Sequence, residues 1–334
     1  MASRSRCLLL WLLLALLLLA LPYLVQTSQQ REILVFLVIN ALVVASYRLL
    51  TLTGEWSLAH VVMMGVGAYG TAIVSKDLGF PPPLAVLTGA GLAAFVAYVL
   101  SFPLFRMKGF YFLIGSFAAG EAIRLSWRLS SLRDVFGGPK GLRSIPTFGE
   151  IELFGHTIDF WNATAFYYLA LAIVAVCLFL LWRVERSRIG MLFHALHWQD
   201  KLAESVGVDA RGYRTLALVV ASGFAGVAGG LYAHYVGSVS PNAFDVSQMV
   251  DVLIWVIVGG TATFYGPLLG LVVLTVLNEL VLRELGVDLA RPLIYGGLLI
   301  LSILFLPQGL ESLVERARAR WRSRREPGRT VSAG

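Results

Sequence analysis

The chain has 334 residues, of which 57% are hydrophobic and only 14% are charged, with a mean hydropathy of +0.76 and a net charge of +7. This composition excludes a water-soluble domain of this size, so lipid is the solvent for most of the chain. The basic residues gather at the ends of apolar segments and in an arginine-rich tail, which indicates anionic lipid headgroups and excludes nucleic acid as a partner.

Residues 1–24 have the charged start and the apolar run that are typical of a signal peptide. The apolar run is about 18 residues long and no small-residue cleavage motif follows it before Thr27, so we expect a retained first membrane span, with a cleaved signal as the alternative. The two cysteines, Cys7 and Cys177, lie inside apolar segments, which excludes a disulfide framework and a cysteine metal cluster.

We expect an all-α polytopic membrane protein of about ten transmembrane helices, because a helix needs about 20 apolar residues to cross the hydrocarbon layer. In chain order the predicted spans are 7–25, 33–51, 57–75, 83–104, 110–127, 164–183, 215–236, 247–264, 266–283 and 291–307.

Charge and parity predict the orientation of these spans. With the N-terminus inside, eighteen of the 27 basic residues fall on the cytoplasmic side, and an even number of spans returns the basic tail to that side. We therefore expect a multi-pass protein of the cell inner membrane with both termini in the cytoplasm.

The span count is least certain over residues 237–290, where Pro241, Asp245, Asp251 and the run GGTATFYGP interrupt the hydrophobic pattern. Such interruptions are typical of broken or re-entrant helices, which leaves eight or nine spans as open alternatives.

Two polar segments separate the spans, and they define the expected organisation. Residues 128–162, rich in Gly and Pro with short β-prone stretches, are predicted to form the extracytoplasmic loop; Asn162 begins a weak glycosylation sequon there. Residues 184–214 are predicted to form a cytoplasmic insert of two short helices around Gly190 and Gly207. The permease domain is expected over 1–310, and a basic cytoplasmic tail over 311–334.

Small residues predict where helices pack closely. The run from Gly65 to Gly70 fits a dinucleotide-binding spacing, but it lies within an apolar span and no acidic residue follows at the required distance, so close helix packing explains it better. Ala221, Ala225, Gly229 and Ala233 recur at intervals of four, beside a second ridge that includes Gly226 and Gly230. These ridges indicate helix packing, with a subunit interface or a pore lining as the alternative.

Ionisable groups within spans are costly unless they are paired or hydrated, so they are candidates for function. Glu121 and Arg124 lie three residues apart on one helical face, and Glu279 and Arg283 lie four apart. A satisfied ion pair is the preferred interpretation, and a substrate contact is the alternative. The histidines lack metal-ligand spacing, and no nucleotide-binding P-loop motif occurs, so ATP is not bound here by such a loop.

Several segments together make the chain resemble the permease subunits of branched-chain amino acid ABC importers, a family that also serves urea and short amides. The segments are GEWSLAHVVMMGVGAY (54–69), MKGFYFLIGSFAAGEAIRL (107–125), GGPKGL (137–142), ERSRIGMLFHALHWQDKLAESVGVDARGYR (185–214), FAGVAGGLYAHYVGSVSPNAF (224–244), GGTATFYGPLLG (259–270) and PQGL (307–310).

The resemblance implies a non-enzymatic permease that forms the path for branched-chain amino acids or related solutes. Its implied partners are a second permease subunit, two ATPase subunits that hold ATP and Mg, and a secreted or lipid-anchored binding protein; no cofactor is expected on this chain. The implied ATPase-coupling residues are Ile189, Gly190, Leu192, Ala195, Leu196, Asp200, Glu204 and Gly207. Candidates for the translocation path or for helix packing are Gly65, Gly67, Gly226, Gly230, Gly259 and Gly260.

Two other functions remain open. A self-contained secondary transporter would couple the solute to a proton through Glu121, Asp251 or Glu279. A membrane-embedded enzyme would use His60 or His234 as a general base. The insert favours the ATP-driven importer, because a secondary transporter has no need of a helical docking segment. We expect no catalytic or metal site.

Overall fold

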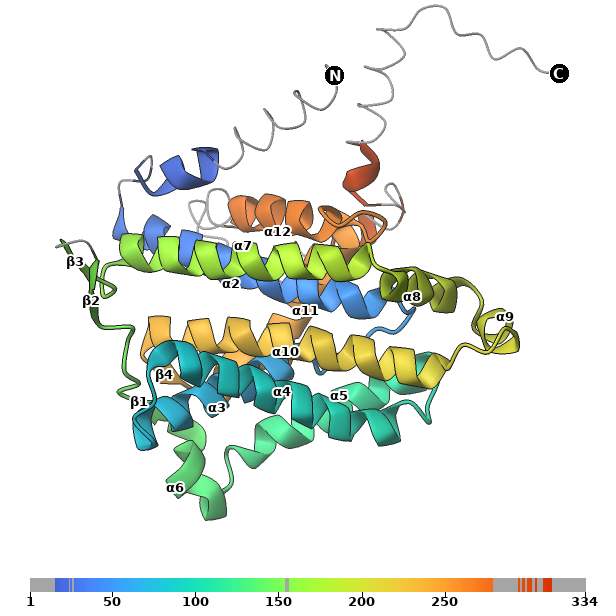
Figure 1. The fold of residues 1–334 in the computed structure, drawn as a ribbon, viewed down its shortest axis with the longest axis horizontal. Coiled ribbons are helices and arrows are strands. Elements are labelled where there is room, and N and C mark those ends of the chain that lie inside the picture. The colour runs from blue at the N-terminus through green and yellow to red at the C-terminus, as the bar shows by residue number, and fades with distance from the viewer. Residues whose placement is uncertain are drawn as a thin grey trace, which may run out of the picture.

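The computed structural model describes residues 16–23, 25, 27–153, 156–278, 294, 296–297, 299–301, 304 and 309–313. Over these residues the chain is a bundle of long helices, with two small antiparallel pairs of strands (Figure 1). The main helices are α2 (Ser28–Thr51), α3 (His60–Asp77), α4 (Pro82–Leu104), α5 (Phe110–Ser126), α7 (Ala163–Glu185), α10 (Ala210–Val236) and the shorter α11 (Val246–Gly259) and α12 (Gly266–Leu277). The expectation of a helical polytopic fold is confirmed at this level.

The centre of the bundle is the close packing of α3, α4 and α10. A side chain at Gly67 would overlap the backbone of Gly226, so these two positions let α3 and α10 approach at backbone distance. Without a hydrophobic driving force between helices in lipid, such contacts depend on small residues that permit close van der Waals packing. The small-residue ridges of α10 therefore face α3 and α4 inside the subunit.

Helix α2 lies between α10 and α7 and also packs against α12 (Figure 1). Every residue from Leu42 to Thr51 is buried, including Arg48. The outer helices differ. α4 exposes Leu87, Phe95 and Phe102, and α7 exposes Phe179, as expected for surfaces that meet lipid or another subunit.

Five stretches among the described residues are long and apolar enough to cross a membrane, namely α2, α4, α7, α10 and Pro241–Gly259. The chain is therefore a multi-pass membrane protein. Helices α3 and α5 occupy two further predicted spans but have only 18 and 17 residues and are not among the five. Most of the predicted spans 7–25 and 291–307 lies outside the described residues.

The interrupted region consists of two short helices joined by a turn. α11 has 14 residues and follows the 3₁₀-helix η3 (Pro241–Phe244), and α12 has 12 residues. At 1.5 Å per residue, α11 is about 21 Å long, short of the roughly 30 Å of hydrocarbon. Gly260 ends α11 with a φ of 101°, a conformation that favours glycine.

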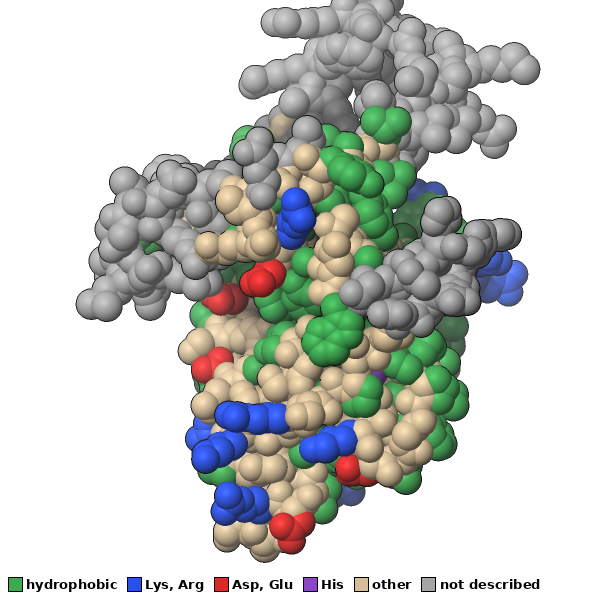
Figure 2. All heavy atoms as spheres, turned by 90° about the vertical axis from the view of Figure 1, so that its left-hand side faces the viewer, with side chains coloured by type: hydrophobic (Ala, Val, Ile, Leu, Met, Phe, Trp, Pro, Cys, Tyr) green, Lys and Arg blue, Asp and Glu red, His purple; other side chains and the backbone are tan. Residues whose placement is uncertain are grey.

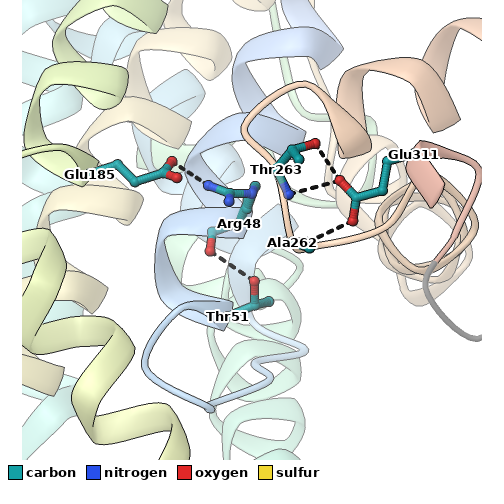
Figure 3. Close-up of polar contacts among 6 residues, drawn as sticks. All are labelled: Arg48, Thr51, Glu185, Ala262, Thr263 and Glu311. Carbon is teal, nitrogen blue, oxygen red and sulfur yellow. Dashed lines mark hydrogen bonds and ion pairs between the residues drawn. The ribbon is translucent and has the colours of Figure 1, made fainter. Parts of the chain in front are cut away.

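The chain after the last predicted span returns to this α11–α12 turn. Glu311, which is buried, accepts hydrogen bonds from the backbone N–H groups of Ala262 and Thr263 at 2.7 and 2.8 Å, and from the Thr263 hydroxyl (Figure 3). Leu310 donates to the carbonyl of Val258. Glu311 and Ser312 were predicted to belong to the basic tail, but both are buried here, so the folded part of the chain extends through Ser312.

The loop of residues 128–162 lies at one end of the bundle and contains η1 (Ser130–Leu132), α6 (Arg133–Phe136), η2 (Gly138–Lys140), β1 (Leu142–Arg143), β2 (Glu150–Leu153) and β3 (His156–Asp159). β2 pairs with β3, and β1 pairs with β4 (Ser238–Val239) just after α10. His234 of α10 donates from Nδ1 to the carbonyl of Pro146 at 2.6 Å. The loop is therefore fastened to the end of α10.

Asn162 at the end of this loop has a structural role. Its side-chain oxygen accepts a hydrogen bond from the N–H of Thr164 at 3.0 Å and so caps the N-terminus of α7. An Asn two residues before a Thr at a helix start has the same letters as a glycosylation sequon, so helix capping accounts for the pattern.

Candidate functional site

The insert of residues 184–214 lies at the end of the bundle opposite the loop (Figure 1). It contains two short helices, α8 (Arg188–Trp198) and α9 (Asp200–Ser205). Gly190 lets α8 fold back on the end of α7, because a Cβ there would overlap the carbonyl of Glu185. Gly207, with a φ of 87°, ends the second helix, and Asp209 caps α10 by accepting from Gly212 N at 3.1 Å.

One face of the insert is packed inward. Phe193 of α8 belongs to the main core, whereas Leu196 packs with Ala203 and Ala210 in a small separate cluster. Leu196 is only 2% exposed. Its role in the observed structure is thus to hold α8 against α9 and the start of α10.

The opposite face carries large apolar side chains that nothing in the described structure covers. Trp198 is 80% exposed, Leu202 60% and Val206 76%. Met191 and Ile189 are exposed on α8 as well. Isolated exposed apolar residues are normal, but several on one short segment are typical of a surface that meets another protein. We call Trp198, Leu202 and Val206 the outer face of the insert.

The inner side of the insert is ion-paired to the segment that ends α2, which we call the α2–α3 corner (residues 48–55). Arg48, 1% exposed, forms an ion pair with Glu185 at the end of α7 (Figure 3). Arg214 of α10 binds both carboxylate oxygens of Asp200 at 2.6 and 2.7 Å, and its Nε lies 3.3 Å from Glu55. These pairs connect both ends of the insert to one corner.

Glu55 in this cluster is electrostatically unusual. Burial raises the pKa of its carboxyl group, and this effect outweighs the nearby Arg214 guanidinium, which favours the charged form. Asp200, close to the same guanidinium, raises the pKa of Glu55 further. The cluster thus holds two carboxylates around one arginine.

The predicted coupling residues divide between the two sides of the insert. Ile189, Ala195, Glu204 and Gly207 are exposed, and Leu192 is half-buried. Gly190 and Leu196 are buried, and Asp200 is turned to Arg214. The sequence pattern did not identify Trp198 and Leu202 as members of the outer face, because the chain leaves the helical conformation at Gln199, between α8 and α9, and no single helical projection relates the two residues.

The six glycine candidates lie where a backbone or a side chain of another segment approaches closely, or, for Gly260, where the chain turns. A Cβ added at Gly65 would meet the rings of Trp127 and Phe244. A Cβ added at Gly230 would lie 2.8 Å from the Thr71 hydroxyl. A Cβ on Gly226 would meet Ala90 and Ala93 of α4 at 2.8 Å. Gly259 adjoins Gly266 across the α11–α12 turn. These contacts are within the subunit, which leaves helix packing as their observed role.

The ionisable candidates are paired or packed where they are described. Glu121 and Arg124 form an ion pair within α5, with Nε of Arg124 at 2.8 Å from the carboxylate. Asp251 lies half-buried on α11, and Glu279 and Arg283 lie outside the described residues. Among the described residues, no group of three or more His, Cys, Asp or Glu side chains could hold a metal ion.

The two histidines proposed for the rival enzyme are packed in the core. Nε2 of His60 lies 3.0 Å from the Ser46 hydroxyl, which itself donates to the carbonyl of Val43. The Ser46 oxygen therefore accepts from Nε2, which fixes the proton of His60 on that nitrogen. Nδ1 of His234 donates its proton to the hydrogen bond with the carbonyl of Pro146. Both rings thus support helix and loop packing.

The apolar helices define a multi-pass membrane protein, and its insert end carries exposed apolar side chains braced by ion pairs. The chain belongs to the family described as the branched-chain amino acid transport system / permease component, which matches residues 31–306. Members of this family are transporter components and not enzymes.

Curated relatives agree with this assignment. The chain is similar to the high-affinity branched-chain amino acid transport system permease protein LivM of Escherichia coli, with 31% identity over 280 residues, which is 78% of this chain and 64% of the relative. LivM of Salmonella typhimurium is 31% identical over the same shares of each chain. The fructose import permease protein FrcC of Rhizobium meliloti is 25% identical, covering 82% of this chain and 76% of that protein. The chain thus spans less than two thirds of the length of the two LivM relatives, and no solved structure matches it.

Proposed function

We propose that this chain is the permease subunit of an ATP-driven importer that carries branched-chain amino acids or related small solutes delivered by a binding protein. Family membership and the names of the relatives support the solute class. The observation that carries the proposal is the outer face of the insert, where Trp198, Leu202 and Val206 stand exposed on a segment braced from behind by ion pairs.

The outer face is the proposed contact for an ATPase subunit. Apolar side chains on short helices suit a groove on a partner, with Ile189, Leu192 and Ala195 beside them and Glu204 at the polar rim. Gly190, Leu196 and Asp200 shape the insert from its inner side, and Gly207 ends its second helix. ATP and Mg are proposed to be bound by two ATPase subunits, because the chain contains no P-loop motif.

This assignment implies an orientation. The insert faces the cytoplasm, both termini lie on that side of the inner membrane, and the loop of residues 128–162 faces outward. The arginine-rich tail that follows Ser312 would lie against anionic headgroups of the cytoplasmic leaflet. We keep the predicted limits of the permease domain, the loop and the insert as part of this proposal, and we extend the domain to the buried Ser312.

A second permease subunit would complete the translocation path. We place the path between the two subunits, partly along the spans 57–75 and 215–236 and the broken region 237–270. The candidate glycines already pack against helices of this subunit, and α3 is buried from His60 to Ala72, so the partly exposed faces of α10 and α11 would line the path.

The loop end is the proposed contact for the binding protein. Lys76, Arg133, Lys140 and Arg143 are exposed there, and Figure 2 shows blue basic side chains gathered on this face. Lys76 donates to the carbonyl of Arg143 at 3.1 Å, which ties the end of α3 to β1. A basic face on the outer side suits a partner with an acidic surface.

The rival transporter requires a carboxylate that exchanges its proton during transport. Glu121 forms an ion pair with Arg124 on the same helix, which favours a structural role for this carboxylate. No described contact favours the rival over the importer, so it is retained only as an outcome of the experiment below.

The experiment is co-expression of the chain with candidate ATPase subunits, followed by affinity purification and measurement of attachment. Trp198→Ala combined with Leu202→Ala should weaken attachment about 30-fold, as expected for central apolar contacts of an interface. Phe179→Ala, which removes a ring that is 54% exposed on the outer side of α7, is the matched control and should leave attachment unchanged. Equal attachment of all three proteins would contradict the proposal.

A further inference from the structure

The insert contacts the α2–α3 corner through three separate links, and these come from its start, its middle and its end. Glu185 pairs with Arg48 at the start. Nδ1 of His197 donates to the carbonyl of Thr51 at 3.2 Å in the middle. Arg214 lies 3.3 Å from Glu55 at the end. Three links that are far apart in the insert restrain both sliding and rotation relative to the corner.

The corner itself is a tightly bonded turn. Leu52 donates to Arg48, Thr53 to Leu50 and Gly54 to Thr51 through backbone hydrogen bonds of 3.0 to 3.1 Å. The hydroxyls of Thr51 and Thr53 add bonds of 2.8 Å to the carbonyls of Arg48 and Leu50. A turn with this many internal bonds moves as one body, because any local bend would break buried hydrogen bonds.

The corner leads into the interior of the subunit. Arg48 lies over the ring of Phe264 in the α11–α12 turn, with 6.0 Å between the guanidinium carbon and the ring centroid. Leu58, just beyond the corner, donates to the Ser116 hydroxyl of α5 at 3.0 Å. α3 then begins at His60 and packs between α10 and α4. A displacement of the corner therefore reaches α5, the α11–α12 turn and the centre of the bundle.

Arg48 is built to hold one partner. The side chain is buried, and its Nε and Nη2 atoms form no hydrogen bond with any of the described residues. Its charge is balanced by the single carboxylate of Glu185. Because a buried charge without its partner is strongly unfavourable, Arg48 should follow Glu185 when the insert moves.

We infer that the α2–α3 corner receives the motion of the insert, and that Arg48, Glu185, His197 and Arg214 are positioning residues that convert ATPase closure into movement of α2 and α3. This inference rests on the proposed function. The end of α4 also contacts the insert region, but through one exposed hydrogen bond, in which Arg211 donates to the carbonyl of Phe102 at 3.0 Å.

The test uses the complete importer in proteoliposomes and measures both ATP hydrolysis and uptake of radiolabelled leucine, isoleucine and valine. The variant Arg48→Met with Glu185→Gln removes both charges together, so neither is left buried alone. His197→Ala is a milder second variant that removes one hydrogen bond and no charge. Both should keep ATPase attachment and hydrolysis, whereas solute moved per ATP hydrolysed should fall, by about tenfold for the double variant, within the range of coupling residues.

The matched control is Arg124→Met with Glu121→Gln, the same chemical change at an ion pair internal to α5. It should leave uptake per ATP at the wild-type value. An unchanged ratio in both corner variants would overturn the inference, as would loss of ATPase attachment, which would make the corner part of the docking contact. A wild-type complex without ATP-driven uptake would instead overturn the proposed function, and with it the inference.

Discussion

Large apolar side chains of the insert differ in their surroundings: some pack inside the subunit and others are exposed. Leu196 is buried in the cluster that braces α8, whereas Trp198 is 80% exposed two residues later. Leu196→Ala should destabilise the purified subunit by about 2 to 5 kcal/mol, because it removes packing and leaves a cavity. Trp198→Ala should change stability by no more than about 0.5 kcal/mol. Thermal unfolding in detergent measures both, and an equal loss in the two variants would contradict the assignment of the two faces.

Glu55 predicts a dependence of stability on pH. Burial raises the pKa of its carboxyl group, so the folded state binds this proton more tightly than the unfolded state does. The stability that this group contributes is fully present below the ordinary pKa of glutamate and is lost as the pH rises through the raised value. Glu55→Gln should therefore flatten the change in melting temperature as the pH rises above the ordinary pKa of glutamate, about 4.3. If the melting temperature of the variant kept the wild-type dependence on pH, Arg214 would fully offset the effect of burial on the pKa of Glu55, which would contradict this prediction.

Arg48 shows the limit of sequence reasoning at this scale. In the sequence it is a cation near the end of an apolar run, which indicates orientation and nothing more. Its partner, Glu185, lies 137 positions away, and no local pattern predicts such a pair. Glu121 and Arg124 were paired correctly from the sequence because both lie on one helix, where spacing alone brings them together.

Among the elements, β1 shows how the loop depends on one glycine. Gly141 has a φ of 69°, and a Cβ there would overlap the carbonyl of Val239 in β4. Gly141→Ala should therefore break the β1–β4 pairing and make the loop sensitive to proteases. Gly149 has a similar φ of 70° but open space around it, so Gly149→Ala should carry only the backbone strain of about 1 kcal/mol. Equal protease sensitivity in the two variants would contradict this account.

The bounds of the observed helices match those of the predicted spans closely where hydrophobicity and burial agree. The span predicted at 164–183 is observed as Ala163–Glu185, and that at 215–236 extends back to Ala210 because Asp209 caps it. α3 is different: it is covered by α10 and α4, so it carries the buried His60 without needing an apolar surface toward lipid, and its Lys76 is exposed at the loop end. The sequence did not predict that the folded part of the chain includes Glu311. Its carboxylate accepts hydrogen bonds from backbone N–H groups of a distant turn, and no local sequence pattern predicts such bonds.

At the scale of the whole molecule, the two ends of the bundle carry opposite kinds of surface, an apolar outer face on the insert and a basic face on the loop. Reversing charge with Arg133→Glu and Lys140→Glu should slow association with an acidic binding protein by about tenfold at low salt, and less at high salt. Arg106→Glu, exposed beyond the other end of α4, is the control. Surface-plasmon measurements on the reconstituted importer would show this, and salt-independent loss or no loss would contradict it.

The central claim is that this permease moves solute only when ATPase subunits act on its insert. The most direct measurement is uptake of leucine, isoleucine and valine into proteoliposomes, comparing ATP with an imposed proton gradient, for the chain alone and for the complex with its partners. The account predicts uptake that requires the complex, the binding protein and ATP, and that is lost when Trp198 and Leu202 are both changed to Ala. Uptake by the chain alone on a proton gradient, abolished by Glu121→Gln, would contradict it and identify a secondary transporter.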